Sequence, residues 1–354
     1  MNEKKDKKPP RVRHVAVKVG LDSVEHAEKL MDYFRVRGDS DPLSVKQVAD
    51  QMRLAVDRVM GEGSLYAPAL AALALKQAEG DTVEAACLLR AYRSTQPRWG
   101  YSLPISTRDM VIVSRATSAF KDIPGGQFLG PSKDYSQKLL RFGLREESQD
   151  EIQALLRECT NGELLEQVPE SFPRLIDLLR ERGLLEDDAG AKGVVEEPFD
   201  ITLQGLVYPA PRSAQLQALA RGETGGMLAL AYSTMSSSVS HPILAEVRVG
   251  YCPMRVTHPY LKEPVTIGEV LVTECDMLDT FVSSATQPGA PKLRLGYGLC
   301  FGQNEIKAIA MSVLDLMLRS RGSAHPASQQ EFVLRNIEGT ESAGFIQHLK
   351  LPHY

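Results

Sequence analysis

Residues 243–256 read ILAEVRVGYCPMRV, and this stretch decides the fold together with two that follow it. Residues 265–278 read VTIGEVLVTECDML, and residues 292–302 read KLRLGYGLCFG. Such runs of β-branched and aromatic residues between turn residues are typical of strands. The next segment, residues 304–322, has apolar residues at helical spacing. Strands in succession without long intervening helices favour an antiparallel or mixed sheet in an α+β domain.

The first part of the chain predicts helices. Residues 24–39 and 44–63 have helical apolar spacing. Residues 67–95 predict an antiparallel helix pair that meets at Gly80, with Asp81 as the N-cap of the second helix. Helical spacing returns in three later segments, residues 134–145, 149–159 and 172–183.

These patterns predict an α+β protein, with a helical N-terminal region followed by a mixed, mainly antiparallel sheet domain with packed helices. The expected parts are a disordered basic tail at residues 1–13, a mainly helical domain at 14–185, a linker at 186–200 and an α+β domain at 201–354. The linker is expected where glycine mixes with acidic residues and the apolar periodicity stops.

The composition limits the function classes. A formal net charge of -4 and a pI near 6.0 argue against a general nucleic-acid-binding protein. The five cysteines are scattered and form no C-x-x-C pair, which indicates a reducing compartment. No apolar run approaches the ~20 residues of a membrane span, and the N-terminus lacks the apolar core of a signal peptide. We therefore expect a cytoplasmic protein with neither nucleic acid nor membrane as a partner.

A glycine-bearing stretch, KDIPGGQFLGP at residues 121–131, contains Lys121, Gly125 and Gly126. Glycines let backbone N–H groups approach an anion, and a helix expected to begin near Ser132 would add partial positive charge, so the stretch suits a phosphate. It matches neither G-x-x-x-x-G-K-[ST] nor G-x-G-x-x-G. A plain turn held by its prolines is the alternative.

Two carboxylates occupy one face of the strand predicted at residues 265–278. Glu274 and Asp276 are two residues apart, so their side chains point to the same side. Paired carboxylates can perform acid and base chemistry. A strand end at the protein surface is the alternative interpretation.

The segment GFIQHLKLPHY, residues 344–354, carries His348 and His353. Pro352 would end a helix here, and the alternation of residues 349–351 predicts a short half-buried strand. Two neutral imidazoles are a common half of a zinc site, whose other ligands would have to come from elsewhere. Alternatively, the rings cap the local backbone.

A set of blocks resembles, in order, the PhnI family, a core subunit of bacterial carbon-phosphorus lyase. The blocks are residues 54–63, 69–95, 121–140, 228–234, 240–251, 270–277, 296–315, 331–334 and 343–354. The resemblance covers nearly the whole chain from about Val15. Collinear blocks of this kind are more specific than any single motif.

The resemblance implies that this chain, with companion subunits, displaces the adenine of ATP by a phosphonate at ribose C1′, which gives α-D-ribose 1-methylphosphonate 5-triphosphate. Alone, it implies a purine nucleosidase acting on ATP and GTP. It also implies that His348 and His353 hold a zinc ion facing the radical lyase subunit. The alternatives are a non-catalytic scaffold that docks the radical subunit and supplies half of a zinc site, and a stand-alone metal hydrolase.

The implied reaction assigns further roles by residue type. The triphosphate needs basic groups and backbone amides, for which Lys121, Gly125, Gly126 and Lys133 are the candidates. An oxocarbenium-like transition state at C1′ needs a nearby negative charge, for which Glu274 and Asp276 are the candidates.

Overall fold

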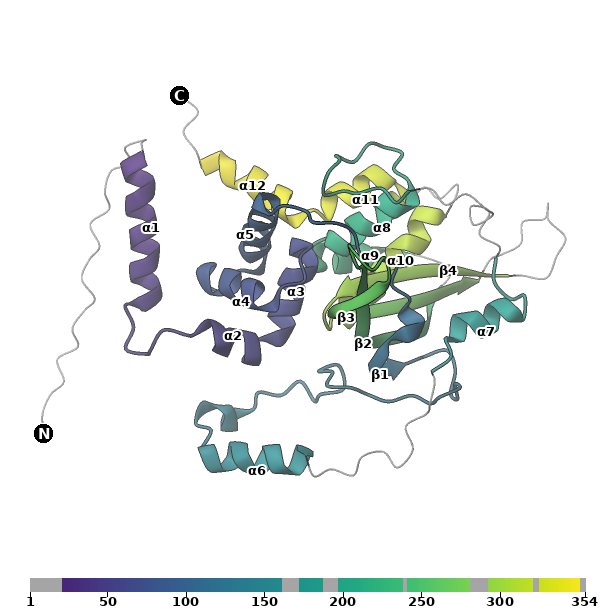
Figure 1. Ribbon diagram of the computed structural model, residues 1–354, viewed down its shortest axis with the longest axis horizontal. Helices are drawn as coiled ribbons and strands as arrows, with labels where there is room; N and C mark the ends of the chain where they lie inside the picture. The colour runs from purple at the N-terminus through teal and green to yellow at the C-terminus, as the bar shows by residue number, and fades with distance from the viewer. Residues whose placement is uncertain are drawn as a thin grey trace, which may run out of the picture. The chain divides into compact units, whose positions relative to one another are not determined.

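Four strands form an antiparallel sheet in the order β1-β2-β3-β4 (Figure 1). The strands are β1 (Val111–Ala116), β2 (Ile243–Thr257), β3 (Pro264–Thr280) and β4 (Leu293–Phe301). The structure, a computed structural model, describes residues 21–160, 172–186, 197–237, 241–280, 292–320 and 325–350. β2, β3 and β4 are the three strands predicted from the sequence, and the α+β class is confirmed.

Contacts divide the chain into two units, Met1–Ser44 and Val45–Tyr354. Within the second unit, β1 pairs with β2 although it lies in the part of the chain expected to be mainly helical, residues 14–185. The tail at residues 1–13 and most of the expected linker, residues 187–196, lie outside the described residues. The division at residue 185 therefore stays a prediction.

One face of the sheet is apolar and is covered by α10 (Glu305–Arg319), which follows β4 directly. Gly296 and Gly298 of β4 make close packing possible: a Cβ atom on them would lie 2.2 Å from the carbonyl oxygen of Ser312 and 2.1 Å from that of Ala308. The core between the two layers includes Val247, Cys275, Met277, Met311 and Leu314. Strand glycines here permit the close approach of a helix backbone.

The opposite face of the sheet carries charged side chains. Glu246 and Arg248 of β2 lie beside Glu274 and Asp276 of β3 in the strand register, and all four are at most 2% exposed. Arg174 and the first residue of α7 (Leu175–Glu181) cover them, since Arg174 pairs with both carboxylates of β3 and the backbone N–H of Leu175 donates to Glu246. The sheet thus has one apolar face and one face, which we call the ionic face, that combines this charged row with apolar positions such as Val272 and Leu278.

The predicted helix pair is confirmed in a small bundle beside the sheet. The bundle consists of α2 (Val45–Gln51), α3 (Arg53–Gly63), α4 (Pro68–Gln77) and α5 (Thr82–Thr95). Asp81 accepts hydrogen bonds from the N–H groups of Val83 and Glu84 and so caps α5, and Gly80 has φ 94°. The apolar faces of the four helices form a core of their own.

Further short elements complete the fold. They are η1 (Thr107–Asp109), α8 (Arg212–Arg221), α9 (Thr224–Ser237), η3 (Pro326–Ser328), α11 (Gln330–Asn336), α12 (Gly339–Gln347) and η4 (His348–Lys350). In the described part of the chain, no helix is both long enough and apolar enough to cross a bilayer.

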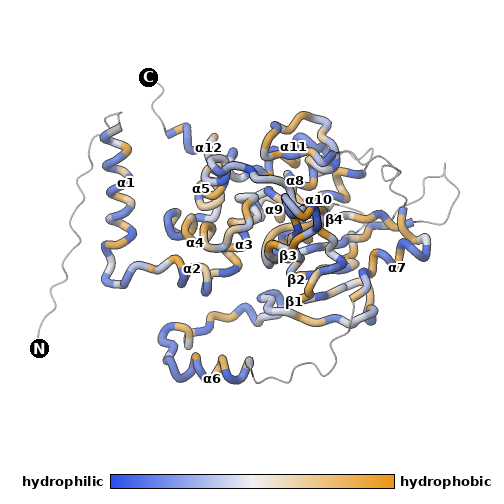
Figure 2. The backbone as a smooth tube through the Cα atoms, in the orientation of Figure 1, coloured by the Kyte–Doolittle hydropathy of each residue, from blue (hydrophilic) through white to orange (hydrophobic). Residues whose placement is uncertain are grey.

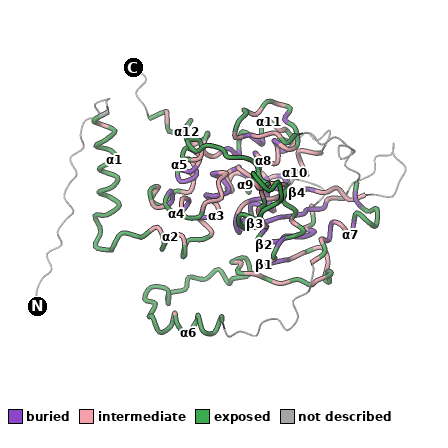
Figure 3. The backbone as a smooth tube through the Cα atoms, viewed as in Figure 1, coloured by how far each residue is buried: buried purple, intermediate pink, exposed green. Residues whose placement is uncertain are grey.

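Two helices, α1 (Leu21–Val36) and α6 (Gln149–Thr160), are exposed along their length (Figure 3). Figure 2 shows hydrophobic and hydrophilic residues interleaved along α6. The helix expected at 134–145 is wrong except for a short 3₁₀ segment, η2 (Phe142–Arg145). Leu139 and Leu140 are 73% and 82% exposed there, so no apolar packing stabilises a helix.

Candidate functional site

Glu274 and Asp276 lie side by side on the ionic face of β3, where they are 1% and 2% exposed. The expectation that they share one face is confirmed, and the alternative of a surface strand end is wrong. Their places in the register are opposite Arg248 and Glu246 on β2. A row of charges inside a sheet requires ion pairs and hydrogen bonds to offset the loss of water.

Glu274 is held by four partners. It accepts hydrogen bonds from the hydroxyls of Thr107 (2.8 Å) and Tyr297 (2.9 Å), and it forms ion pairs with Arg248 and with Arg174 (3.3 Å). Burial raises the pKa of Glu274, but the two guanidinium groups and the hydrogen bonds outweigh this effect and hold the pKa below its usual value. Glu274 is therefore a fixed negative charge.

Asp276 is less well satisfied. Its Oδ2 accepts a hydrogen bond of 2.7 Å from Arg174, while its buried Oδ1 has no hydrogen-bond partner among the described residues. Burial, only partly opposed by Arg174, raises the pKa of Asp276 to about 6. Two carboxylates whose environments separate their pKa values are the arrangement from which acid and base roles are assigned.

Arg174 connects this pair to a cavity of about 510 Å³. It is the N-cap residue of α7 and lines the cavity together with Arg108, Phe172 and Asp177. Its Nε is buried without a hydrogen-bond partner among the described residues. The carboxylates themselves do not line the cavity, so the charge that they present to it is that of their cationic partner, Arg174.

Arg174 and Arg248 were not singled out from the sequence. A signal for Arg248 was present, because it follows Glu246 by two residues in the apolar strand at 243–256, which puts both side chains on the same face. Two opposite charges on one face of a strand indicate a buried ion-pair row. Arg174 gives no comparable signal, since it precedes Asp276 by 102 residues.

The glycine-bearing loop, residues 121–131, contains a turn that hydrogen bonds hold in place. Gly125 and Gly126 both have positive φ, 83° and 75°, and the N–H of Gly126 donates to the carbonyl of Ile123 (2.9 Å). The buried guanidinium of Arg115 binds the carbonyl of Pro124 (2.6 Å), so this carbonyl points inward. The expected helix near Ser132 is wrong: residues 131–141 form bends and turns, so no helix terminus supports the loop.

The four phosphate candidates do not meet in one cavity. Lys121 is exposed before the turn at Gly125 and Gly126, and its carbonyl accepts a hydrogen bond from the side chain of Gln127 (3.0 Å). Lys133 lines a different cavity, of about 280 Å³, with Arg58 and Asn304. The structure places Lys133, and not Lys121, next to a second cation.

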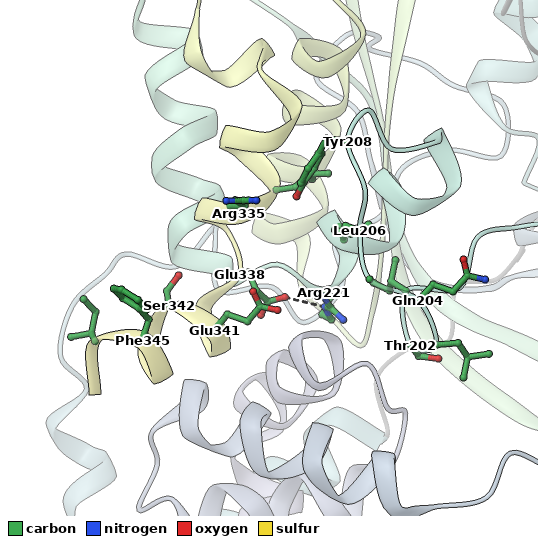
Figure 4. Close-up of a pocket in the computed structure, with 16 residues that line it drawn as sticks. Thr202, Gln204, Leu206, Tyr208, Arg221, Arg335, Glu338, Glu341, Ser342 and Phe345 are labelled. Atoms are coloured by element: carbon green, nitrogen blue, oxygen red, sulfur yellow. Dashed lines mark hydrogen bonds and ion pairs between the residues drawn. The ribbon is translucent and has the colours of Figure 1, made fainter. Parts of the chain in front are cut away.

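Figure 4 shows a cavity of about 990 Å³ between residues 201–208 and helices α8, α11 and α12. Arg221 and Glu338 form an ion pair of 3.0 Å on its wall, and the guanidinium of Arg335 lies 5.9 Å from the ring centre of Tyr208. Phe345 lines the cavity from α12. The wall charges are balanced, and α12 leads from this cavity to His348.

His348 follows α12 directly, and His353 lies outside the described residues. Nδ1 of His348 donates a hydrogen bond to the backbone carbonyl of Phe345. The ring centres of Phe345 and His348 are 4.8 Å apart. The expected strand at 349–351 is wrong at its described positions, because residues 348–350 form η4 and Leu349 is 62% exposed. A helical turn can form at residues 348–350 because Pro352 disfavours helical geometry only at the residue directly before it and beyond.

The described residues contain no group of three or more histidine, cysteine, aspartate or glutamate side chains that could hold a metal ion. Any zinc bound by His348 would need ligands from outside the described residues. The ring itself fits such a role. A proton on Nδ1, donated to a carbonyl, puts the lone pair on Nε2, as in many zinc-bound histidines.

Comparisons with known proteins agree on one family. The family described as "Bacterial phosphonate metabolism protein (PhnI)" matches residues 13–354. The chain is 43% identical over 357 residues to the alpha-D-ribose 1-methylphosphonate 5-triphosphate synthase subunit PhnI of Escherichia coli (strain K12), covering 96% of this chain and 94% of that one. It is 42% identical over 348 residues to the subunit of the same name from Rhizobium meliloti (strain 1021), covering 96% and 91%.

A third relative carries a different name. The chain is 45% identical over 348 residues to the putative C-P lyase subunit protein HtxH of Stutzerimonas stutzeri, covering 96% of this chain and 92% of that one. Identity at this level over nearly the full length implies a common fold and descent. This chain belongs to the PhnI family of bacterial phosphonate metabolism proteins.

Proposed function

We propose that this chain is a subunit of a carbon-phosphorus lyase core complex that displaces the adenine of ATP by methylphosphonate at ribose C1′. The product is α-D-ribose 1-methylphosphonate 5-triphosphate, and the chain alone is a purine nucleosidase on ATP and GTP. The observation that carries the proposal is 42–43% identity, over 96% of this chain, to two proteins named as subunits of that synthase.

The reaction breaks the C1′–N9 bond as a phosphonate oxygen bonds to C1′. Positive charge develops on the ribose, so a fixed negative charge nearby lowers the barrier. Glu274 and Asp276 are the candidates for this role. Both are almost fully buried behind Arg174, so this role requires that the Arg174 guanidinium, with which both are paired, turns away from the ribose. Lys133 remains the best placed candidate for the triphosphate, ahead of Lys121, Gly125 and Gly126.

Zinc enters the proposal through His348 and His353. A zinc ion there supplies a Lewis acid that can bind phosphate or phosphonate oxygens. The Nδ1 hydrogen bond of His348 orients its ring for such a ligand role. The remaining ligands are expected from the neighbouring subunit.

A scaffold function is the second candidate, and one observation favours it. Phe345, Ile346 and Leu349, on α12 and the turn after it, are 68%, 63% and 62% exposed. Contiguous exposed apolar side chains are typical of protein–protein contacts. In this case the chain docks the radical lyase subunit next to the histidine pair and performs no chemistry itself.

Adenine release separates the two functions. The complex co-purified with its lyase partners, and the full-length chain alone, are incubated with ATP with and without methylphosphonate, and free adenine is measured by chromatography. The enzymatic proposal expects adenine from both samples, with the ribose phosphonate formed only by the complex. If neither sample releases more adenine than a buffer control, the enzymatic proposal fails and the scaffold function is the one that remains.

Metal analysis of the same complex tests the zinc site. The double variant His348→Ala plus His353→Ala is expected to lose about one zinc per chain while the complex stays assembled, because two of the ligands are gone. His258→Ala, at a turn histidine whose Nδ1 binds the backbone N–H of Leu261, is the control that keeps its zinc. Unchanged zinc in the double variant would remove the terminal pair from consideration.

A further inference from the structure

Two cavities adjoin where the loop after β4 turns into α10. The first, of about 330 Å³, is lined mainly by apolar and aromatic side chains, among them Met60, Tyr66, Val249, Tyr251 and Leu271. The second, of about 280 Å³, is lined mainly by polar ones, among them Arg58, Ser132, Lys133, Thr224 and Asn304. Pro131 and Gln303 line both cavities and form the boundary between them.

Among the residues that the structure describes, Asp57 is the one carboxylate that lines the apolar cavity. It is 7% exposed, and its Oδ2 accepts a hydrogen bond of 2.9 Å from the backbone N–H of Gln303. The structure gives its Oδ1 no hydrogen bond from the residues that it describes. Burial raises the pKa of Asp57 more than Gln303 and Arg53 lower it, so its acid form is favoured relative to a carboxyl in water.

The loop that carries Gln303 is built around this carboxylate. Gly302 has φ 72°, and a Cβ atom on it would lie 2.3 Å from Cγ of Asp57, so only glycine permits the close approach. Arg53 donates to the side-chain oxygen of Gln303 and to the carbonyl of Pro131 (2.8 Å). The boundary between the cavities is therefore fixed by hydrogen bonds.

The polar cavity suits a polyphosphate. Lys133 brings a positive charge to it, and the first turn of the 15-residue helix α10 adds the partial positive charge of its N-terminus. Arg58 also lines it, with its guanidinium paired to Glu62 and Glu223. Asp134 and Glu305 also line the cavity, and carboxylates of this kind can share the Mg²⁺ that accompanies a triphosphate.

We infer that the two cavities together form a purine nucleoside triphosphate site, with the base between Tyr66 and Tyr251, the phosphates at Lys133 and Arg58, and Asp57 as the proton donor to the departing base. This inference rests on the proposed nucleotide substrate. It assigns the leaving-group chemistry to a residue on α3. Glu274 and Asp276 point to the opposite face of the sheet from Leu271, so a nucleotide in this site does not contact them, and the role proposed for them above does not apply here.

The chemical step is balanced as follows. The electron pair of the C1′–N9 bond moves to the purine, whose N7 takes the proton of the Asp57 carboxyl and leaves as neutral adenine. A phosphonate oxygen supplies the pair for the new bond to C1′. The proton of the phosphonate hydroxyl returns to the Asp57 carboxylate, so no other co-reactant is needed.

Binding and chemistry are tested separately on the co-purified complex. Binding is measured by equilibrium dialysis with Mg²⁺ and carbocyclic ATP, which has the shape of ATP but a stable bond to the base. Lys133→Ala is expected to raise the Kd roughly 10- to 100-fold, because it removes a charged phosphate contact. Tyr251→Ala is expected to raise it through lost stacking. Lys46→Ala, whose side chain is 83% exposed and lines neither cavity, is the control with an unchanged Kd.

Asp57→Asn keeps an acceptor for the N–H of Gln303 but carries no acidic proton. It is expected to bind carbocyclic ATP like the wild type while releasing adenine from ATP about 10²- to 10⁴-fold more slowly. Wild-type release should fall as pH rises through the Asp57 pKa, and the variant should lack this fall. Arg53, Tyr66 and Cys300 are the other charged or titratable groups that interact with Asp57; burial raises the pKa of both Tyr66 and Cys300, so neither titrates near neutrality.

The outcomes distinguish this inference from the proposed function. If the wild type releases adenine but the Kd is unchanged in Lys133→Ala and Tyr251→Ala, the inference is overturned and the function stands. If those variants lose binding but no wild-type adenine appears, the site stands and the function fails. A full rate in Asp57→Asn overturns the role of Asp57, and no wild-type binding at all overturns the site.

Discussion

At the scale of single residues, Glu274 and Asp276 show how environment separates two similar side chains two positions apart. Glu274 has two guanidinium groups and two hydroxyls around it, whereas Asp276 has one guanidinium and a buried oxygen without a partner among the described residues. The same burial therefore leaves one carboxylate ionised and makes the other titrate near pH 6.

The raised pKa of Asp276 predicts a pH dependence of stability. Since its pKa in the folded protein, about 6, exceeds the unfolded value, its contribution is fully present below the unfolded pKa and is lost as pH rises through 6. Between pH 5 and 7.5 the free energy of unfolding should fall by about 1 kcal/mol because of this group. Asp276→Asn should lack this component of the fall.

Urea unfolding at both pH values measures the effect. Asp41→Asn, an exposed position in the first unit, is the control for the loss of one acidic charge and should keep the wild-type slope. Parallel slopes for the wild type and Asp276→Asn would show that Asp276 does not titrate in this range.

What the sequence could predict at this scale follows from distance along the chain. The common face of Glu274 and Asp276 is local, set by the two-residue period of a strand, and it was predicted. Their burial and their contacts with Arg174 and Thr107 were not, because these two residues reach them from segments far earlier in the chain. Asp57 was missed for the same reason: its partner Gln303 is 246 residues away.

At the scale of elements, the strongest sequence patterns gave correct predictions. The three long strands and the helix after them have clear periodicity and neighbours that agree with it. β1 was missed because it has only six residues and lies in a stretch surrounded by helical patterns. For residues 134–145 the reverse happened: a helix was predicted but did not form, since the apolar residues there are exposed and do not pack against a core.

The contact between β4 and α10 predicts the effect of one methyl group. Gly298→Ala places Cβ 2.1 Å from the carbonyl oxygen of Ala308, so the helix must move off the sheet. We expect the free energy of unfolding to fall by about 3 kcal/mol, the upper end of the usual cost of overpacking, because the clash is with backbone and not with a flexible side chain. Gly100→Ala, where a Cβ meets nothing within 4 Å, is the matched control and should stay within about 0.5 kcal/mol of the wild type.

Chemical denaturation measures the free energy of unfolding of both variants. A Gly298→Ala protein as stable as Gly100→Ala would mean that β4 and α10 are not in backbone contact. Adenine release by a Gly298→Ala complex that still assembles then reports whether the neighbouring loop at Gln303 needs this packing.

At the scale of the whole molecule, α6 and α12 are two of the elements that expose large apolar side chains. α6 has no buried residue, and Leu155 and Leu156 on it are 57% and 51% exposed. With Phe345 and Ile346 on α12, these are the surfaces that partner subunits of the proposed complex would cover.

Amide hydrogen exchange tests this view of the assembly. In the isolated chain, amides of α6 should exchange within seconds to minutes, since none of the residues of this helix is buried, whereas amides of α10 should be protected. In the co-purified complex, α6 and α12 should both gain protection. Equal exchange in the two states would show that neither helix lies in a subunit contact.

The two faces of the sheet have different consequences for motion. Lifting α10 would expose the apolar face to water at about 25 cal/mol per Å². Lifting the segment before α7 instead returns ionic groups to water, and hydration replaces part of what their lost partners provided. Because the apolar residues of α7 pack on Ala245 and Leu278, opening on this side should be confined to Arg174 and the residues just before it. Such a local opening gives solvent protons a route to the strand interior that the helical side denies them.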